Sequence, residues 1–274
     1  SKLGTTVCSE WNGFLNMVNI LEHVNNSDSV LFVSTSLYDS TGSKKDQLYF
    51  SIQPKAQYDV LVHDMRGRDK DRYGLVCSTH SGNPADLDGR MVYYKDELLK
   101  PGTLEFAFAL PFANSQSGKQ FLTFNTYQPS ASPKDVSNMV ANWIQVTNYT
   151  NSTQSGRLRF FDMSGNPIGQ TEVKLNAFAR SDISGHQFGK NLVGLVEWAP
   201  SDNNAKFQIR ETRYLYDNSI GVPSFSTAYQ LEGVTGTGDE QIITIDNESS
   251  STIIEISNTL DIHAPASIRI VNLE

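Results

Sequence analysis

The chain has 274 residues, of which 38% are hydrophobic and 19% are charged, and its formal net charge is −8. Nucleic acids and anionic membranes are recognised through a concentrated basic face, so this charge argues against both as partners. The length suggests two ordinary domains with room for part of a third, and no apolar run approaches the roughly 20 residues that span a bilayer.

A hairpin pattern recurs along the chain, in residues 14–39, 142–162 and 253–271. In each copy, apolar residues alternate along a first strand that ends at an Asn, and a second strand follows after a turn. We match Asn19, Asn148 and Asn258 as the residues that end the first strand. Internal repeats of this kind predict a tandem array of similar units.

The first unit follows an N-terminal arm, residues 1–13. Its strands are short and rich in β-branched and aromatic residues. Turn-forming residues separate them about every 8–12 residues, without helical periodicity, which is typical of antiparallel β-sandwiches. We therefore expect a first sandwich over residues 14–127. Its strands are expected at 14–20, 30–38, 48–52, 59–63, 73–78, 90–94, 104–110 and 120–125.

The second unit repeats these landmarks after a Pro- and Ser-rich linker, residues 128–139. Phe161 and Asp162 match Tyr38 and Asp39 before a Gly-containing turn, and Gly194-Leu195-Val196 matches Gly74-Leu75-Val76. We expect the second sandwich over residues 140–250. The predicted fold class is therefore all-β, with two tandem antiparallel β-sandwich (Ig-like) domains plus a C-terminal strand pair.

The third copy, residues 251–274, contains only two strands, and a lone hairpin is marginally stable in water. Its apolar face consists of Ile253, Ile254, Ile256, Ile268, Ile270 and Val271. Three arrangements would cover this face: packing on the second sandwich, donation of strands to a neighbouring molecule, or membership of a longer chain. The first copy begins at its hairpin, without the two strands that precede the later copies. Head-to-tail strand donation would therefore complete both ends.

The only two cysteines are Cys8 and Cys77. Both lie in the first half of the chain, which is compatible with one disulfide in an oxidising compartment; the alternative is two buried thiols. The matching position of the second unit is Glu197, so the disulfide would be specific to the first unit. With the mildly acidic, hydroxyl-rich composition, this favours an extracellular or cell-surface location.

No motif supports nucleophilic catalysis, so we predict no enzyme activity, catalytic residue or cofactor. His80 and Ser81 lie near Asp86 and Asp88, but neighbours in sequence do not make a triad, and a polar turn explains them better. Asp86 and Asp88 are also weak calcium candidates, because carboxylate oxygens are ligands that Ca²⁺ prefers. The alternative is a solvated turn.

A carbohydrate-binding surface requires exposed aromatic rings. Trp11 and Trp198 have no aromatic counterpart in the other unit, which makes them the best surface candidates for glycan contact. Phe14 and Trp143 instead occupy alternating positions that are expected to face a core. N-glycosylation motifs, relevant only in a host that glycosylates secreted proteins, occur at Asn25, Asn148, Asn151 and Asn247.

The matched pattern is an aromatic-Asp-x-x-Gly turn, an Asp-apolar strand, a Gly-Leu-Val strand and a Tyr-rich closing strand. It resembles the tandem repeats of large uncharacterised bacterial secreted proteins, over most of the chain from Trp11 onward. The resemblance implies an exported modular protein and no catalytic residue. We therefore expect a non-catalytic structural or adhesive module that self-associates, as a filament or surface-layer subunit built by strand donation. The alternative is a carbohydrate-binding module of a secreted protein.

Overall fold

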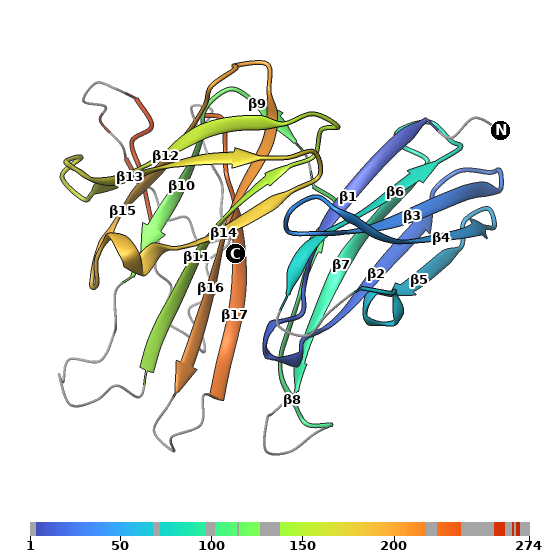
Figure 1. The fold of residues 1–274 in the computed structure, drawn as a ribbon. Coiled ribbons are helices and arrows are strands. Elements are labelled where there is room, and N and C mark those ends of the chain that lie inside the picture. Colours follow the sequence, from blue (N-terminus) through green and yellow to red (C-terminus); the bar gives the residue numbers. More distant parts are fainter. Residues whose placement is uncertain are drawn as a thin grey trace.

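The computed structural model describes residues 4–67, 72–96, 102–113, 115–126, 138–217, 224–236, 255–260, 265 and 267–268. Within these ranges the chain forms β-strands and three short 3-10 turns, and no α-helix. The strands make four antiparallel sheets that pair into two β-sandwiches (Figure 1). The predicted all-β sandwich fold is confirmed. No helix of the described ranges is long and apolar enough to cross a membrane.

Sandwich 1 contains the first eight strands. Their bounds are β1 Thr5–Asn12, β2 Val18–Asn25, β3 Leu31–Asp39, β4 Lys44–Ile52, β5 Gln57–Leu61, β6 Tyr73–His80, β7 Leu87–Asp96 and β8 Leu104–Pro111. The 3-10 turns η1 (Phe14–Asn16) and η2 (Val62–Asp64) follow β1 and β5. Sheet A has the strand order β1-β6-β3-β4, and sheet B has the order β5-β2-β7-β8.

Sandwich 2 contains the remaining strands. Their bounds are β9 Gln116–Ser117, β10 Gln120–Asn125, β11 Asn138–Asn148, β12 Gln154–Asp162, β13 Pro167–Leu175, β14 Arg180–Ser184, β15 Val193–Pro200, β16 Lys206–Asp217 and β17 Ser224–Glu232. The 3-10 turn η3 (Gly185–Phe188) follows β14. Sheet C has the order β14-β11-β16-β17, with β9 paired to β16, and sheet D has the order β10-β15-β12-β13.

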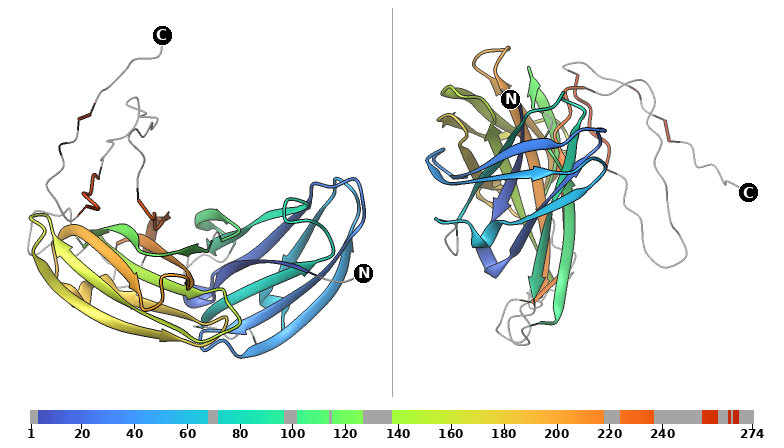
Figure 2. Two further views of the ribbon diagram at one scale, coloured as in Figure 1. Left: turned by 90° about the horizontal axis from the view of Figure 1, so that it is seen from above. Right: turned by 90° about the vertical axis from the view of Figure 1, so that its right-hand side faces the viewer.

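Each sandwich buries its own hydrophobic core, because alternate residues of every strand point between the two sheets. In sandwich 1 the core includes Trp11, Leu21, Leu37, Val76 and Met91. In sandwich 2 it includes Phe124, Ile144, Leu158, Phe160, Val196 and Trp198. The two sandwiches lie side by side and form a curved pair (Figure 2).

The two sandwiches share one topology. Replacing β1–β8 by β10–β17 in order converts sheet A into sheet D and sheet B into sheet C. Gly74 of β6 and Gly194 of β15 confirm the register, because a Cβ at either position would overlap the carbonyl oxygen of Tyr38 or Phe161. The strand registers therefore give a residue-by-residue equivalence between the two units, as expected for a duplicated sequence.

The N-terminal arm expected over residues 1–13 is a strand. β1 is an edge strand of sheet A and pairs along its whole length with β6. It occupies the place that β10 has in sandwich 2, so sandwich 1 is complete. The premise of strand donation, a first copy that lacks strands, is wrong. The alternation of apolar and polar residues did not identify β1 as a strand, because both faces of β1 are buried from Cys8 to Asn12.

The boundary between the units also differs from the prediction. Residues 120–125, assigned above to the first sandwich, form β10 and pair with β15 in sheet D. The first sandwich therefore ends at β8, and the second begins at β9. Residues 128–137 of the expected linker lie outside the described residues, and its last two residues belong to β11.

The counterpart of Asn148 is Asn25, and the match to Asn19 is wrong. In both residues the side-chain Oδ1 accepts a hydrogen bond from the backbone N–H two residues ahead, at 2.9 Å from Ser27 and 3.0 Å from Thr150. Each Nδ2 donates to three backbone carbonyls, those of Ser29, Ile52 and Gln53 or of Ser152, Leu175 and Asn176. The predicted strand at 14–20 was placed too early, because η1 precedes β2.

This shift also corrects two core predictions. Phe14 and Trp143 were expected to face a core, and both are exposed. Trp143 precedes Ile144, which is fully buried in the core. Side chains that are adjacent along a strand point to opposite faces, so an error of one residue exchanges inside and outside.

The predicted C-terminal hairpin is described only in part. Of its expected apolar face, Ile256 and Ile268 are 57% and 60% exposed. Ile253, Ile254, Ile270 and Val271 lie outside the described residues. Residues 255–260 belong to no sheet in the described ranges.

Candidate functional site

The two sandwiches meet through a set of buried polar side chains, which we call the joint. Its charged members are Glu10, Arg180 and Arg210, which are buried, and Asp182, which is partly buried. Its hydroxyl groups are those of Tyr93, Thr147 and Tyr214, which are buried, and of Tyr149, which is partly buried. Glu10 points outward from sheet A of sandwich 1. Strands β14 and β16 of sandwich 2 supply the other charged groups, and the hydroxyls come from β11 and β16, from Tyr149 just after β11, and from β7 of sandwich 1.

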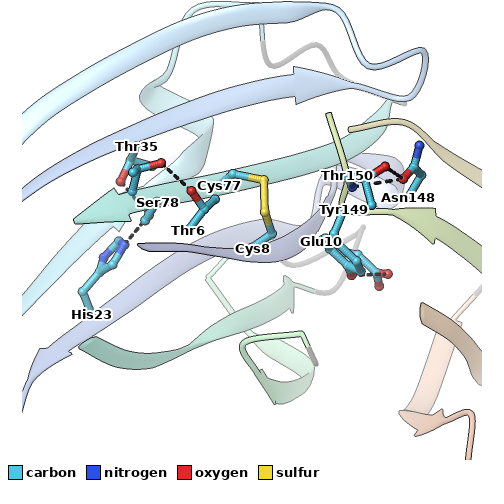
Figure 3. The surroundings of a disulfide bond; sticks show 11 residues. Thr6, Cys8, Glu10, His23, Thr35, Cys77, Ser78, Asn148, Tyr149 and Thr150 are labelled. Atoms are coloured by element: carbon cyan, nitrogen blue, oxygen red, sulfur yellow. Dashed lines mark hydrogen bonds between the residues drawn. A yellow bond between two sulfur atoms is a disulfide. The ribbon is translucent and has the colours of Figure 1, made fainter. Parts of the chain in front are cut away.

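Glu10 is the centre of the joint and is only 1% exposed. Its Oε1 accepts hydrogen bonds from the Thr147 hydroxyl at 2.7 Å and from the Tyr149 hydroxyl at 3.2 Å; Figure 3 shows Glu10 beside Tyr149. Its Oε2 lies 3.5 Å from Arg210 Nη1. Burial raises the pKa of this carboxyl, but Arg210, Arg180 and the two hydroxyls outweigh burial and leave the pKa below its ordinary value. Glu10 is therefore ionised inside the protein.

Arg180 connects sandwich 2 to the end of β1. Its Nε and Nη2 donate to the two carboxylate oxygens of Asp182, both at 2.7 Å, and its Nη1 donates to the backbone carbonyl of Trp11 at 3.1 Å. The guanidinium also lies over the Tyr73 ring, 5.0 Å from its centroid. This bidentate geometry fixes the orientation of Arg180 more strictly than a single contact would.

The equivalent positions of sandwich 1 show that the joint causes this burial. The strand registers match Arg210 to Arg90, whose side chain is 59% exposed and pairs with Glu22 at 2.5 Å. The same registers match Arg180 to Gln57, which is exposed. The repeat therefore places polar residues on this face in both units, and only sandwich 2 buries them.

Apolar contacts surround the charged centre. Phe178 of sandwich 2 stacks on Tyr38 of sandwich 1 with ring centroids 4.8 Å apart, and together with Tyr149 they cover Cys8, Leu75 and Cys77. Gly42 has φ of +84°, and a Cβ there would overlap the carbonyl oxygen of Ala177. The backbones of the two sandwiches therefore approach closely at this turn.

Cys8 and Cys77 form a disulfide between directly opposed positions of β1 and β6, with an S–S distance of 2.08 Å. The disulfide lies on the outer face of sheet A near Tyr149 of sandwich 2 (Figure 3). A pocket of 350 Å³ opens beside it, with Cys8, Tyr149 and Phe178 in its wall. The disulfide thus secures the edge strand that carries Glu10.

The chemistry of the joint is that of paired charges. Each carboxylate faces a guanidinium, and the described residues contain no group of three His, Cys, Asp or Glu side chains that could hold a metal ion. A buried ion pair contributes little net stability when it forms, but breaking it is costly because one charge is left uncompensated. The arrangement can therefore fix the relative orientation of two domains.

A second polar cluster lies in the core of sandwich 1. His23 Nε2 lies 2.8 Å from the Ser78 hydroxyl, which is 2.7 Å from the Thr35 hydroxyl, and all three side chains are fully buried (Figure 3). The equivalent residues of sandwich 2 are apolar: Val146, Trp198 and Leu158. Burial lowers the pKa of His23 to about 4, so this imidazole is neutral near pH 7.

We expect this histidine to make the stability of sandwich 1 depend on pH. The unfolded state takes up a proton below an ordinary pKa of about 6.5, whereas the folded state resists it down to about 4, so stability falls as the pH drops through this window. The loss is roughly 3 kcal/mol in all. Urea unfolding between pH 7 and pH 4 measures it, and His23→Val, the residue of sandwich 2, should flatten the slope. An equal slope in both proteins would contradict this assignment.

The structure contradicts the predicted glycan-binding residues. Trp11 and Trp198 are 0% exposed, so neither ring can lie against a sugar. Trp11 Nε1 donates to the backbone carbonyl of Tyr38 at 2.9 Å, and Trp198 packs edge-on against Phe207. Both fill cores. For Trp11 the signal itself also fails, because the register gives it an aromatic counterpart in Phe124.

Of the predicted calcium residues, Asp86 lies in a turn and Asp88 lies in β7, and neither belongs to a group of three possible metal ligands among the described residues. Asp86 accepts a hydrogen bond from the backbone N–H of Asn83 at 2.7 Å, and Asp88 accepts one from the N–H of Gly89. His80, considered above as a catalytic base, is buried and accepts from the N–H of Gly82. These side chains shape the turns on either side of them, and their geometry offers no support for calcium or for a triad.

Sequence reasoning missed every charged member of the joint. Glu10 lay in the expected arm, and Arg180 and Arg210 lay in strands where a charged residue normally faces water. The one available signal is the run Cys8-Ser9-Glu10-Trp11-Asn12, which carries polar and apolar residues on both faces of an edge strand that is buried throughout. An edge strand with two buried faces requires a neighbouring domain.

Comparison with known proteins identifies no family for this chain. No family model matches the sequence, and a search of curated proteins finds no match. Similar solved structures include a β-glucuronidase 2 of Bacteroides uniformis, with 8% identity, a TM-score of 0.17 and coverage of 83% of this chain and 26% of that chain. A glycosyl hydrolase family 2 member of Bacteroides cellulosilyticus has the same identity and TM-score, with coverage of 83% and 28%. The chain spans well under half of these proteins, and TM-scores this low carry no argument.

Proposed function

We propose that this chain is a non-catalytic structural module, in which two β-sandwiches are held as one rigid body and act as a spacer in an extracellular or cell-surface protein. The observation that supports the proposal is the joint. Glu10 and Arg210 are both buried between the sandwiches, and burial of opposite charges is tolerable only in a fixed, paired geometry. Domains joined by a flexible linker leave such groups in water.

Two further features support this role and location. The Cys8–Cys77 disulfide is of a kind that persists in oxidising compartments. The apolar contact of Phe178 with Tyr38 adds hydrophobic area to the charged centre, which resists bending at the joint. A tandem unit with a fixed angle suits a stalk or surface layer, where each unit sets the position of the next.

The other roles expected from the sequence have lost their motivation. The position in sandwich 1 that strand donation was expected to fill is occupied by β1. Glycan contact through Trp11 and Trp198 is contradicted by their burial. Self-association of the whole chain stays a prediction.

Pulsed electron paramagnetic resonance tests the proposal. Spin labels on Tyr49→Cys and Met163→Cys would report on one exposed site in each sandwich, and the bonded native cysteines would not react. We expect a single narrow distance distribution, as narrow as that of a control pair, Tyr49→Cys and Leu104→Cys, within sandwich 1. A distribution much broader than that of the control would refute a rigid spacer.

A further inference from the structure

The C-terminal segment contacts sandwich 2 through one well-defined ion pair. Oε1 of Glu255 accepts hydrogen bonds from Asn125 Nδ2 at 2.8 Å and from Arg213 Nη1 at 2.9 Å, and its Oε2 accepts from Arg213 Nη2 at 2.8 Å. Arg213 is buried and also donates to Glu211 and Thr123. A bidentate guanidinium–carboxylate contact of this kind positions the segment in one orientation.

The residues that receive Glu255 are the equivalents of residues that receive sandwich 2. Thr123 and Asn125 pair with Leu195 and Val193 in sheet D as Glu10 and Asn12 pair with Leu75 and Tyr73 in sheet A. In the joint, Glu10 contacts Thr147, and Asn12 Nδ2 donates to the Tyr214 hydroxyl at 3.3 Å. The same end of each sandwich thus contacts the repeat that follows it.

The segment that docks is also the equivalent one. Oδ1 of Asn258 accepts a hydrogen bond from the N–H of Leu260 at 3.0 Å, the turn that Asn25 and Asn148 make at the ends of β2 and β11. Aligning Asn258 with Asn148 places Ser257 at Thr147 and Glu255 two residues before it, on the same side of the strand. Glu255 therefore takes the place of Gln145, which lies on the side of β11 that carries Thr147 toward Glu10.

Part of the receiving end is still open. The equivalent of Gly42, which meets Ala177 in the joint, is Gly165, and no described atom lies within 4 Å of a Cβ built there. The equivalent of Tyr38, on which Phe178 stacks, is Phe161, which instead lines a shallow pocket of 520 Å³ with Arg159 and Ile168. A further sandwich seated like sandwich 2 would cover both places.

We propose that this end of sandwich 2 is the docking surface for the third copy of the repeat, seated as sandwich 2 is seated on sandwich 1. Residues 255–258 are the equivalent of the Asn-ended part of β11, and the Glu255–Arg213 pair holds them on their own chain. The inference rests on the proposed function, since it extends a rigid stack by one unit. It also replaces strand donation between molecules with stacking within one molecule.

Spin labels on Met163→Cys and Leu260→Cys of the full chain test this docking. We expect a narrow distance distribution, its loss on adding Glu255→Gln, and its retention with Glu172→Gln, which removes a carboxylate from an exposed ion pair with Arg157. Dilution with unlabelled protein should leave the distance unchanged, because the contact lies within one chain.

Two results would overturn the docking. One is a broad distribution in the protein that retains Glu255, and the other is a distance that disappears on dilution, which would show that a second molecule supplies the segment. The Tyr49–Met163 pair reports on the joint separately. A failure of the docking with a narrow Tyr49–Met163 distance would therefore leave the proposed function intact.

Discussion

Replacing Glu10 by Gln is expected to destabilise the protein by about 3–5 kcal/mol, the cost of removing one partner from a buried ion pair. Gln keeps the size of the side chain and can still accept from the hydroxyls of Thr147 and Tyr149. What it removes is the negative charge that faces Arg210 and Arg180 across the joint. Those guanidiniums then remain buried with less compensation, and the sandwiches gain by separating.

Urea unfolding followed by tryptophan fluorescence measures this effect, because Trp11 lies directly beside Glu10 in β1. Glu172→Gln is the matched control, since its ion pair with Arg157 is exposed and should contribute less than about 1 kcal/mol. Adding Arg210→Met to Glu10→Gln should recover part of the loss, because it removes a buried guanidinium whose only remaining ion pair among the described residues is the one with Glu232, at 2.6 Å. If the Glu10 and Glu172 variants lost the same free energy of unfolding, the charge of Glu10 would contribute nothing specific to the stability of the joint.

The fold class was predictable because its signals are local. Asp39 and Asp162 each accept from backbone N–H groups of the turn that follows, at 2.9 Å from Thr41 and 2.8 Å from Ser164, so the matched turns have a physical cause that the sequence carries. Gly74 and Gly194 are matched for a similar reason, since no side chain fits against the neighbouring carbonyl. Residues with such local causes are kept in both copies of a duplicated sequence, so they indicate the duplication.

The joint was not predictable, because burial there depends on contacts between units. Arg90 and Arg210 occupy the same position of the repeat, yet one is exposed beside Glu22 and the other is fully buried between Glu10 and Glu232. Their neighbours in sequence do not distinguish them. Only the position of sandwich 2 on sandwich 1 does, and the strand that carries Glu10 was taken for an arm. Long-range contacts decide which of two identical residues becomes part of a site.

The prediction that Trp11 and Trp198 are exposed was wrong for a related reason. Trp198 fills space that sandwich 1 gives to Ser78 beside His23, so the two cores are packed with different residues in the same topology. A large residue with a small counterpart therefore indicates repacking of the core as readily as exposure. The residue type at one position of a repeat does not predict its burial unless the residues packed against it are known.

The second large loss of stability is expected when a buried asparagine at the end of β2 or β11 is replaced by Asp. Asn148→Asp keeps the oxygen that accepts from the N–H of Thr150, but it replaces the Nδ2 donor with a carboxylate oxygen facing three carbonyls. Asn148 is fully buried, so we expect a loss of roughly 3 kcal/mol or more at neutral pH from unsatisfied and repelling oxygens. Asn25→Asp should do the same in sandwich 1. Thermal unfolding measures both.

Asn151→Asp is the matched control, because Asn151 is exposed and belongs to the neighbouring N-glycosylation motif. It should change stability by less than about 0.5 kcal/mol. A similar small change at Asn148 would mean that its amide does not hold the turn, and the equivalence of Asn25, Asn148 and Asn258 would lose its physical basis. A large change at Asn25 and Asn148 alone would instead identify the motif Asn-x-Ser/Thr in these strands as a structural turn, in which the amide is already committed to backbone carbonyls.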